Sequence, residues 1–313
     1  MTNDHYFIDI KEQIIDNNTI PSNYYSQFDV KRGLRNKDGS GVLAGLSRIS
    51  SVIGSQMVDY QKISVDGDLQ IRDISIFDLC KDLETNKFGY ENIVFLLLVG
   101  RLPESSELTA FSDVMSQNRL VPTEIIDNVI KGLPSNNMMN KLQSVVAALY
   151  GFDVDPDNLD PYLNFCKAVN IIAKMPMAIS YSYLSSYVDN PTFVKPESGM
   201  SHAESFLYML RQGQAPSDLE RDIFDLSLVL HAEHGGGNNS TFTNYVVSSS
   251  GTDIYSSIAA SIASLKGPLH GSANKKVMDM MADIKENVSD WKNESECNDY
   301  LLKILKKEAH DRS

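Results

Sequence analysis

The segment SDLERDIFDLSLVLHAEHGGGNNSTFT (217–243) carries a helix start, a helical apolar pattern and a helix end in one short stretch. Ser217 followed by Glu220 is a capping box, which is the signature of a helix N-terminus. Apolar residues then recur at helical spacing on one face: Leu219, Ile223, Leu226 and Leu230. Because three consecutive glycines from Gly235 cannot sustain a helix, the pattern predicts a helix that ends at His234.

Two histidines, His231 and His234, are expected in the last turn of this helix, on the same side. The unpaired carbonyls of a helix C-terminus favour a protonated imidazole. A glycine-rich loop with free N–H groups can hold an anion, so the segment is a candidate anion site. Two other interpretations stay open: simple capping of the helix end, and a metal pair. The metal pair lacks the HExxH spacing of zinc peptidases, and no third ligand is evident among the six histidines.

A second motif, GPLHGSAN (267–274), follows a segment rich in Ala and Ser at 252–266. That composition predicts a helix that packs closely against its neighbours, at the centre of the fold or at a subunit interface. The next helix is expected to start near Ser272 or Asn274, which places His270 just before a helix N-terminus. The positive end of a helix dipole disfavours imidazolium. A neutral His270 could donate a hydrogen bond to a carbonyl oxygen.

Helical periodicity also dominates the chain before this region. Stop signals such as Gly100 and Gly151 bound several of the segments. Pro176 is expected to kink or divide the longest of them. Alternation typical of a strand is confined to a short piece around Leu69–Ile74. The predicted fold is all-α with a short N-terminal β element, and its further helices are expected at 89–99, 123–132, 138–150, 161–187 and 201–212.

Composition and charge argue against several classes of function. The 313 residues carry a formal net charge of −13, which argues against general binding to nucleic acid. The longest apolar run, Ile93–Val99, is far shorter than the roughly 20 residues of a membrane-spanning helix. The first residues do not resemble a signal peptide, and the three widely spaced cysteines fit a reducing cytoplasm. We therefore expect a cytoplasmic protein that binds neither nucleic acid nor membranes.

The segments HAEHGGGNNSTFT (231–243) and GPLHGSANKKVM (267–278) together resemble the two signature segments of the citrate synthase family, which includes 2-methylcitrate synthases. Other stretches agree with the family in the same order: 42–50, 69–79, 88–108, 141–149, 171–176 and 201–210. The resemblance implies an all-α, multi-helical large domain and a homodimer formed through the 252–266 helix region. It also implies an acyltransferase that condenses acetyl-CoA, or a related acyl-CoA, with oxaloacetate to give citrate and CoA.

The resemblance assigns roles to three residues. His270 would be catalytic, stabilising the enol of the thioester by a hydrogen bond to its carbonyl oxygen. His234 would bind oxaloacetate, and Asn238 is the matching Asn of the first motif, assigned to substrate binding. No cofactor and no metal are implied, since the CoA thioester is a substrate.

The sequence also departs from the family pattern. Gly235 replaces an acidic or bulkier residue, and Asn136–Met138 replaces a His-Pro-Met segment. More seriously, a second catalytic His, the Asp that acts as base and the substrate-binding Arg residues have no match in the 313 residues. The expected organisation is an N-terminal segment (1–40), a large helical domain (41–273) and the first helices of a mostly missing small domain (274–313).

We therefore expect a citrate synthase truncated at its C-terminus, with negligible activity of this chain alone, because general-base catalysis contributes about 10²–10⁴-fold. The alternatives are a non-catalytic helical dimeric scaffold, which could retain dicarboxylate binding, and a metallohydrolase that uses His231 and His234.

Overall fold

A computed structural model describes residues 21–27, 34, 36, 42, 48–59, 61–83, 87–135, 137–271 and 273–310. The chain forms two compact units, residues 1–46 and 47–313. In the first unit the described helix is α2 (Ser22–Gln27). Most of the expected N-terminal segment 1–40 therefore lies outside the described residues, and the expected boundary between residues 273 and 274 stays a prediction.

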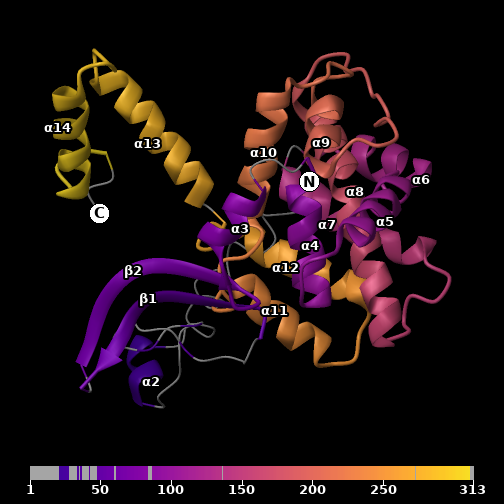
Figure 1. Cartoon of the computed structure of the whole chain (residues 1–313), viewed down its shortest axis with the longest axis horizontal. Helices are drawn as coiled ribbons and strands as arrows, with labels where there is room; N and C mark the ends of the chain where they lie inside the picture. The colour runs from indigo at the N-terminus through magenta and orange to yellow at the C-terminus, as the bar shows by residue number, and fades with distance from the viewer. Residues whose placement is uncertain are drawn as a thin grey trace, which may run out of the picture. The chain divides into compact units, whose positions relative to one another are not determined.

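The second unit starts with an antiparallel sheet in the order β1–β2–β3. Strand β1 (Ser50–Val58) and strand β2 (Gln61–Ile71) form a long hairpin (Figure 1), and β3 (Ile74–Ser75) pairs with the end of β2. The register joins Ser50 to Ile71 and shifts between Ile53 and Ser55. The hairpin is much longer than the sequence predicted. Burial is concentrated at its inner end, where Ile71 is fully enclosed, whereas Ile63 in the outer part is 44% exposed, so most of the hairpin carries no clear alternation of burial.

Helices make up the rest of this unit, and the predicted all-α class is confirmed. They are α3 (Ile76–Leu83), α4 (Gly89–Val99), α5 (Ser105–Gln117), α6 (Thr123–Ile125), α7 (Met138–Leu149), α8 (Pro161–Tyr187), α9 (His202–Leu210), α10 (Asp218–His231), α11 (Asn239–Ser248), α12 (Ile254–Lys266), α13 (Ala273–Asn287) and α14 (Glu294–Leu305). Helix α12 packs against α11 and α7, in agreement with its small residues. In the part of the chain that the structure describes, no helix is long and apolar enough to cross a membrane.

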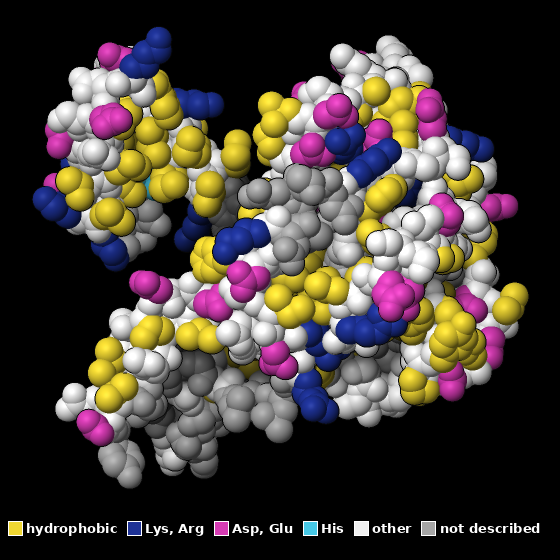
Figure 2. Space-filling view, viewed as in Figure 1, with side chains coloured by type: hydrophobic (Ala, Val, Ile, Leu, Met, Phe, Trp, Pro, Cys, Tyr) yellow, Lys and Arg dark blue, Asp and Glu magenta, His cyan; other side chains and the backbone are white. Residues whose placement is uncertain are grey.

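Within the described residues, the apolar core consists of three clusters. The largest joins α7, α8 and α12 through residues such as Val145, Met177 and Ala259. A second packs α3 and α4 against β2 and includes Val229 of α10. The third lies between α4, α5 and α8. Figure 2 shows further hydrophobic side chains at the surface of α13 and α14, where Met278 and Leu305 are exposed.

Two helical expectations need correction. Pro176 does not divide the segment 161–187, since α8 is one helix with Pro176 buried inside it. Packing of α8 against α9 and α7 compensates for the backbone hydrogen bond that proline cannot make. Segment 123–132 starts as α6 but continues as a π-helix, Ile126–Lys131.

Candidate functional site

Helix α10 begins as the sequence predicted. The backbone N–H of Ser217 donates to the Glu220 carboxylate at 2.9 Å, and the Ser217 hydroxyl accepts from the Glu220 N–H at 3.4 Å. Both halves of the capping box are therefore present. This start fixes the register of α10 and so the position at which the helix reaches the two histidines.

The end of α10 differs from the prediction. The helix stops at His231, so His234 lies three residues beyond it, on an exposed loop, rather than in the last turn. The Nδ1 atom of His231 is 2.7 Å from the carbonyl oxygen of Ser227, one turn earlier. His231 thus caps the helix end, which is the simple structural interpretation that the sequence left open.

Glu233 directs the chain away from the helix. Its Oε1 atom accepts the backbone N–H groups of His234 at 3.0 Å and of Gly235 at 2.5 Å. Gly235 then adopts a φ of +94°, in the left-handed region that favours glycine. A Cβ atom at Gly235 would lie 2.9 Å from Cγ2 of Val52 on β1. The glycine loop is therefore a turn that needs its first glycine.

Asn238 is the N-cap of α11. Its Oδ1 accepts the Thr241 N–H at 2.9 Å, while its Nδ2 donates to the Gly235 carbonyl at 3.2 Å and to Thr241 Oγ1 at 2.9 Å. This side chain closes the glycine loop onto the first turn of α11. Gly236 and Gly237, between these fixed points, are exposed, and a Cβ atom at either would meet nothing within 4 Å.

His270 lies in the turn between α12 and α13, and α13 starts at Ala273 as predicted. Its Nε2 is 2.9 Å from the hydroxyl of Ser240, in the first turn of α11. The same hydroxyl donates to the Ser261 carbonyl of α12 at 3.0 Å. Since a hydroxyl has one hydrogen, Ser240 accepts from Nε2 while it makes this bond, and it donates to Nε2 only when its hydrogen turns away from Ser261.

The structure thus brings His270 to the helix start that Asn238 caps, with His234 four residues before that cap. Sequence reasoning named these three residues but missed Ser240 and Glu233. Both lie inside the quoted motif 231–243, yet their partners are distant in sequence, so the motif alone does not indicate what they contact.

The middle of α10 is held by a buried polar layer, which we define as Glu91, Arg119, His202 and Asp225. The Asp225 carboxylate accepts the Tyr90 N–H at 3.2 Å, at the start of α4, where the N-cap residue supplies no side-chain cap. The Glu91 carboxylate accepts the His202 N–H at 2.7 Å, at the start of α9. Side chains from one helix therefore cap the next, and this joins α10 to α4 and α4 to α9.

Burial shifts the ionisation of this layer. It raises the pKa of Glu91 to about 7 and that of Asp225 to about 7, the latter also through repulsion from Glu91. It lowers the pKa of His202 to about 3, with a further effect of the nearby Arg119 charge. Arg119 donates to the Met200 carbonyl at 2.9 Å and to the Ser205 hydroxyl. The layer is compatible with a structural role, because its members cap helices away from the glycine loop.

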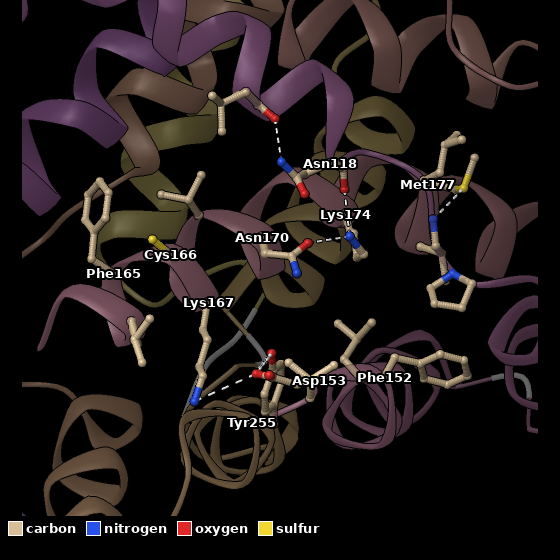
Figure 3. A pocket seen from close by; sticks show the side chains of 18 of the residues that line it. Asn118, Phe152, Asp153, Phe165, Cys166, Lys167, Asn170, Lys174, Met177 and Tyr255 are labelled. Atoms are coloured by element: carbon tan, nitrogen blue, oxygen red, sulfur yellow. Dashed lines mark hydrogen bonds and ion pairs between the residues drawn. The ribbon is translucent and has the colours of Figure 1, made fainter. Parts of the chain in front are cut away.

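A cavity of about 1050 Å³ lies elsewhere, between α5, α8 and α12 (Figure 3). None of His234, Asn238 and His270 lines it. Burial lowers the pKa of Lys174 in its wall to about 8. Lys174 donates to the Asn118 carbonyl at 2.8 Å and to Asn170 Oδ1. The Nζ atom of Lys167 lies 3.8 Å from Asp153 Oδ2.

Over the described residues, no group of three or more His, Cys, Asp and Glu side chains is arranged to hold a metal ion.

Several known proteins are similar to this chain. A family model described as citrate synthase, C-terminal domain, matches residues 38–312. The citrate synthase of Haloferax volcanii is 35% identical over 84% of this chain and 64% of its own length. The citrate/2-methylcitrate synthase of Bacillus subtilis is 36% identical over 67% of this chain and 55% of its own length. This chain thus spans about half to two thirds of these relatives.

Solved structures give the same result. The citrate synthase of Pyrobaculum aerophilum superposes with a TM-score of 0.65 at 31% identity, over 83% of this chain and 65% of that one. A citrate synthase of Thermoplasma acidophilum, solved as a ternary complex with carboxymethyl coenzyme A and oxaloacetate, superposes with a TM-score of 0.64 at 25% identity, over 82% of this chain and 62% of that one.

Proposed function

Because this chain belongs to the citrate synthase family, we propose that it takes part in condensing an acyl-CoA with oxaloacetate. The observation that carries the proposal is the contact of His270 with Ser240 in the first turn of α11, beside the loop of His234. The acyl-CoA is proposed to be acetyl-CoA, with propionyl-CoA as the other member of the same class. The reaction needs no resident cofactor or metal, since the thioester is itself a substrate.

In this proposal Ser240 sets the tautomer of His270. If the Ser240 hydrogen turns from the Ser261 carbonyl to Nε2, a neutral ring carries its own hydrogen on Nδ1. Among the described residues the ring makes no other hydrogen bond, so Nδ1–H can donate to the thioester carbonyl. That bond strengthens as negative charge develops on the oxygen of the enol. His270 would then act as a hydrogen-bond donor, in agreement with its place beside the N-terminus of α11.

The dicarboxylate is proposed to bind at the glycine loop. His234 would contribute a ring donor there, and the exposed Gly236 and Gly237 would contribute backbone N–H groups. Asn238 would support the site without touching the dicarboxylate, because its amide already makes the hydrogen bonds that close the loop. Helix α12 would lie at the interface of a homodimer, where its small residues would permit close contact.

For the 313 residues by themselves we propose dicarboxylate binding with little release of CoA. The second catalytic His, the base Asp and the Arg residues that the family resemblance implies have no match in this sequence. A non-catalytic chain that retains dicarboxylate binding is therefore the second candidate.

Calorimetric titration with oxaloacetate tests the proposal. We expect His234→Ala to weaken binding at least tenfold, which corresponds to losing one charge-assisted hydrogen bond. His231→Ala is the matched control and should bind normally, because that ring caps α10. Equal affinities of the wild type and His234→Ala, or no binding at all, would contradict the proposed site. A CoA-release assay with acetyl-CoA then tests the expected lack of turnover, since measurable turnover would contradict that expectation and exclude the non-catalytic candidate.

A further inference from the structure

The side chain of Glu233 joins two parts of the fold that are far apart in sequence. Its Oε1 accepts the Ser50 hydroxyl at 2.9 Å, in addition to the backbone N–H groups of His234 and Gly235. Ser50 is the first residue of β1, 183 positions away. One carboxylate oxygen therefore collects three donors, two from the loop and one from the sheet.

This arrangement constrains the loop in two ways. Hydrogen bonds to a charged acceptor are about twice as strong as neutral ones, so the turn at His234 is held locally. The Ser50 contact then holds the turn against β1. Val52, on the same strand, lies against Gly235, where a Cβ atom would be 2.9 Å from the Val52 Cγ2 atom. The first turn of the loop is thus held by a polar contact with Ser50 and by an apolar contact with Val52.

The contacts also limit which N–H groups remain for a ligand. The N–H groups of His234 and Gly235 are already used by Glu233. Those of Gly236 and Gly237 lie beyond the contact with β1, on the exposed part of the loop. Glu233 thereby separates a fixed half of the loop from an open half, and His234 belongs to the fixed half.

We propose that Glu233 is a positioning residue that holds His234 for the dicarboxylate by anchoring the glycine loop to Ser50 of β1. This inference deepens the proposed function and rests on it for the identity of the ligand. The anchoring itself is a property of the free protein. The role of β1 in the site follows from these contacts.

Amide hydrogen exchange in the absence of ligand tests the anchor. We expect Glu233→Gln to speed exchange at the His234 and Gly235 amides about tenfold or more, since both lose a charged acceptor. Ser50→Ala should speed it less, because the two local bonds remain and the charge is unchanged. Ser51→Ala is the matched control, since the Ser51 hydroxyl is 3.5 Å from Gln70 and does not touch the loop. Unchanged exchange in Glu233→Gln would overturn the inference.

Binding of oxaloacetate supplies the second readout. Ser50→Ala should weaken binding of oxaloacetate severalfold, and it should shift the His234 ring signal in ¹H–¹³C spectra. Its urea unfolding midpoint should match that of Ser51→Ala. A purely local role of Glu233 would leave both readouts of Ser50→Ala at their wild-type values, and this result would overturn the anchoring. If the wild type itself binds no oxaloacetate, the proposed function fails, whereas the exchange experiment still decides whether Glu233 anchors the loop.

Discussion

The middle and the end of α10 are built in opposite ways. In the middle, Asp225 is 5% exposed and caps another helix, and its carboxylate leaves so little room that a Cβ atom on Gly89 would lie 2.3 Å from it. At the end, His231 and His234 are exposed, and a few polar contacts to Glu233 and Asn238 hold the loop. One helix therefore connects a buried joint to an exposed loop.

The difference separates residues that maintain the fold from residues that are available for chemistry. Buried charged groups are costly unless they are paired, so the polar layer tolerates little change. The exposed loop keeps donors accessible, and substitutions there should affect ligand binding more than stability. Three predictions test this contrast, from the largest expected effect to the smallest.

Removing Arg119 should have the largest effect. Arg119→Met takes away the donor to Met200 and Ser205 and removes one of the positive charges that act on the buried Glu91. We expect the free energy of unfolding, measured in urea, to fall by about 3 kcal/mol, because two buried hydrogen bonds from a charged donor are lost. The control is Arg101→Met at the exposed pair with Glu107, where the solvent screens the charges and only a small loss is expected. Similar losses for both variants would show that the layer is no more rigid than the surface.

The second prediction concerns pH. The pKa of Asp225 is raised to about 7, whereas an unfolded Asp titrates near 4. Between these values the folded protein holds the extra proton, so this contribution to stability is lost as pH rises through 7. Glu91 acts in the same direction, while His202, with its pKa lowered to about 3, adds stability as pH rises from 3 to about 6.5.

A comparison of Asp225→Asn with the wild type isolates the Asp225 contribution. Asn does not titrate, so the variant should gain stability relative to the wild type as pH rises from 4 to 8. The gain is at most about 1.4 kcal/mol per pH unit. The measurement is a series of urea unfolding curves at each pH. A stability difference that is independent of pH would mean that Asp225 is ionised throughout, and the contrast between the two ends of α10 would weaken.

The smallest effect is expected at the helix end. His231→Ala removes the contact with the Ser227 carbonyl and should lower the free energy of unfolding by about 0.5–1 kcal/mol. His234→Ala should change it even less, since the His234 side chain makes no hydrogen bond among the described residues. Thermal unfolding checks both variants. A loss above about 2 kcal/mol at His234 would show that the loop is part of the core.

Much of the fold was predictable because it depends on local signals. The cap at Ser217, the stop at Gly100 and the turn at His270 are short-range features, and the structure confirms them. Parts that depend on distant partners were not predictable. Tyr90 and Asp225 are 135 positions apart, so nothing local indicates that one helix caps the other.

The candidate site divides in the same way. Its histidines are conspicuous residues in short motifs, whereas the role of Glu233 depends on Ser50, and that of Ser240 on His270. The premature end of α10 likewise results from the Glu233 contacts rather than from helix propensity. The length of the hairpin was missed because its outer part buries few side chains.

The close approach of Gly235 to Val52 has an evolutionary consequence. A side chain at position 235 would need both a different backbone angle and space that the valine now occupies. The two positions should therefore change together among relatives. Where an acidic or bulky residue stands in place of Gly235, we expect a smaller residue in place of Val52, so that each lineage carries one compatible pair.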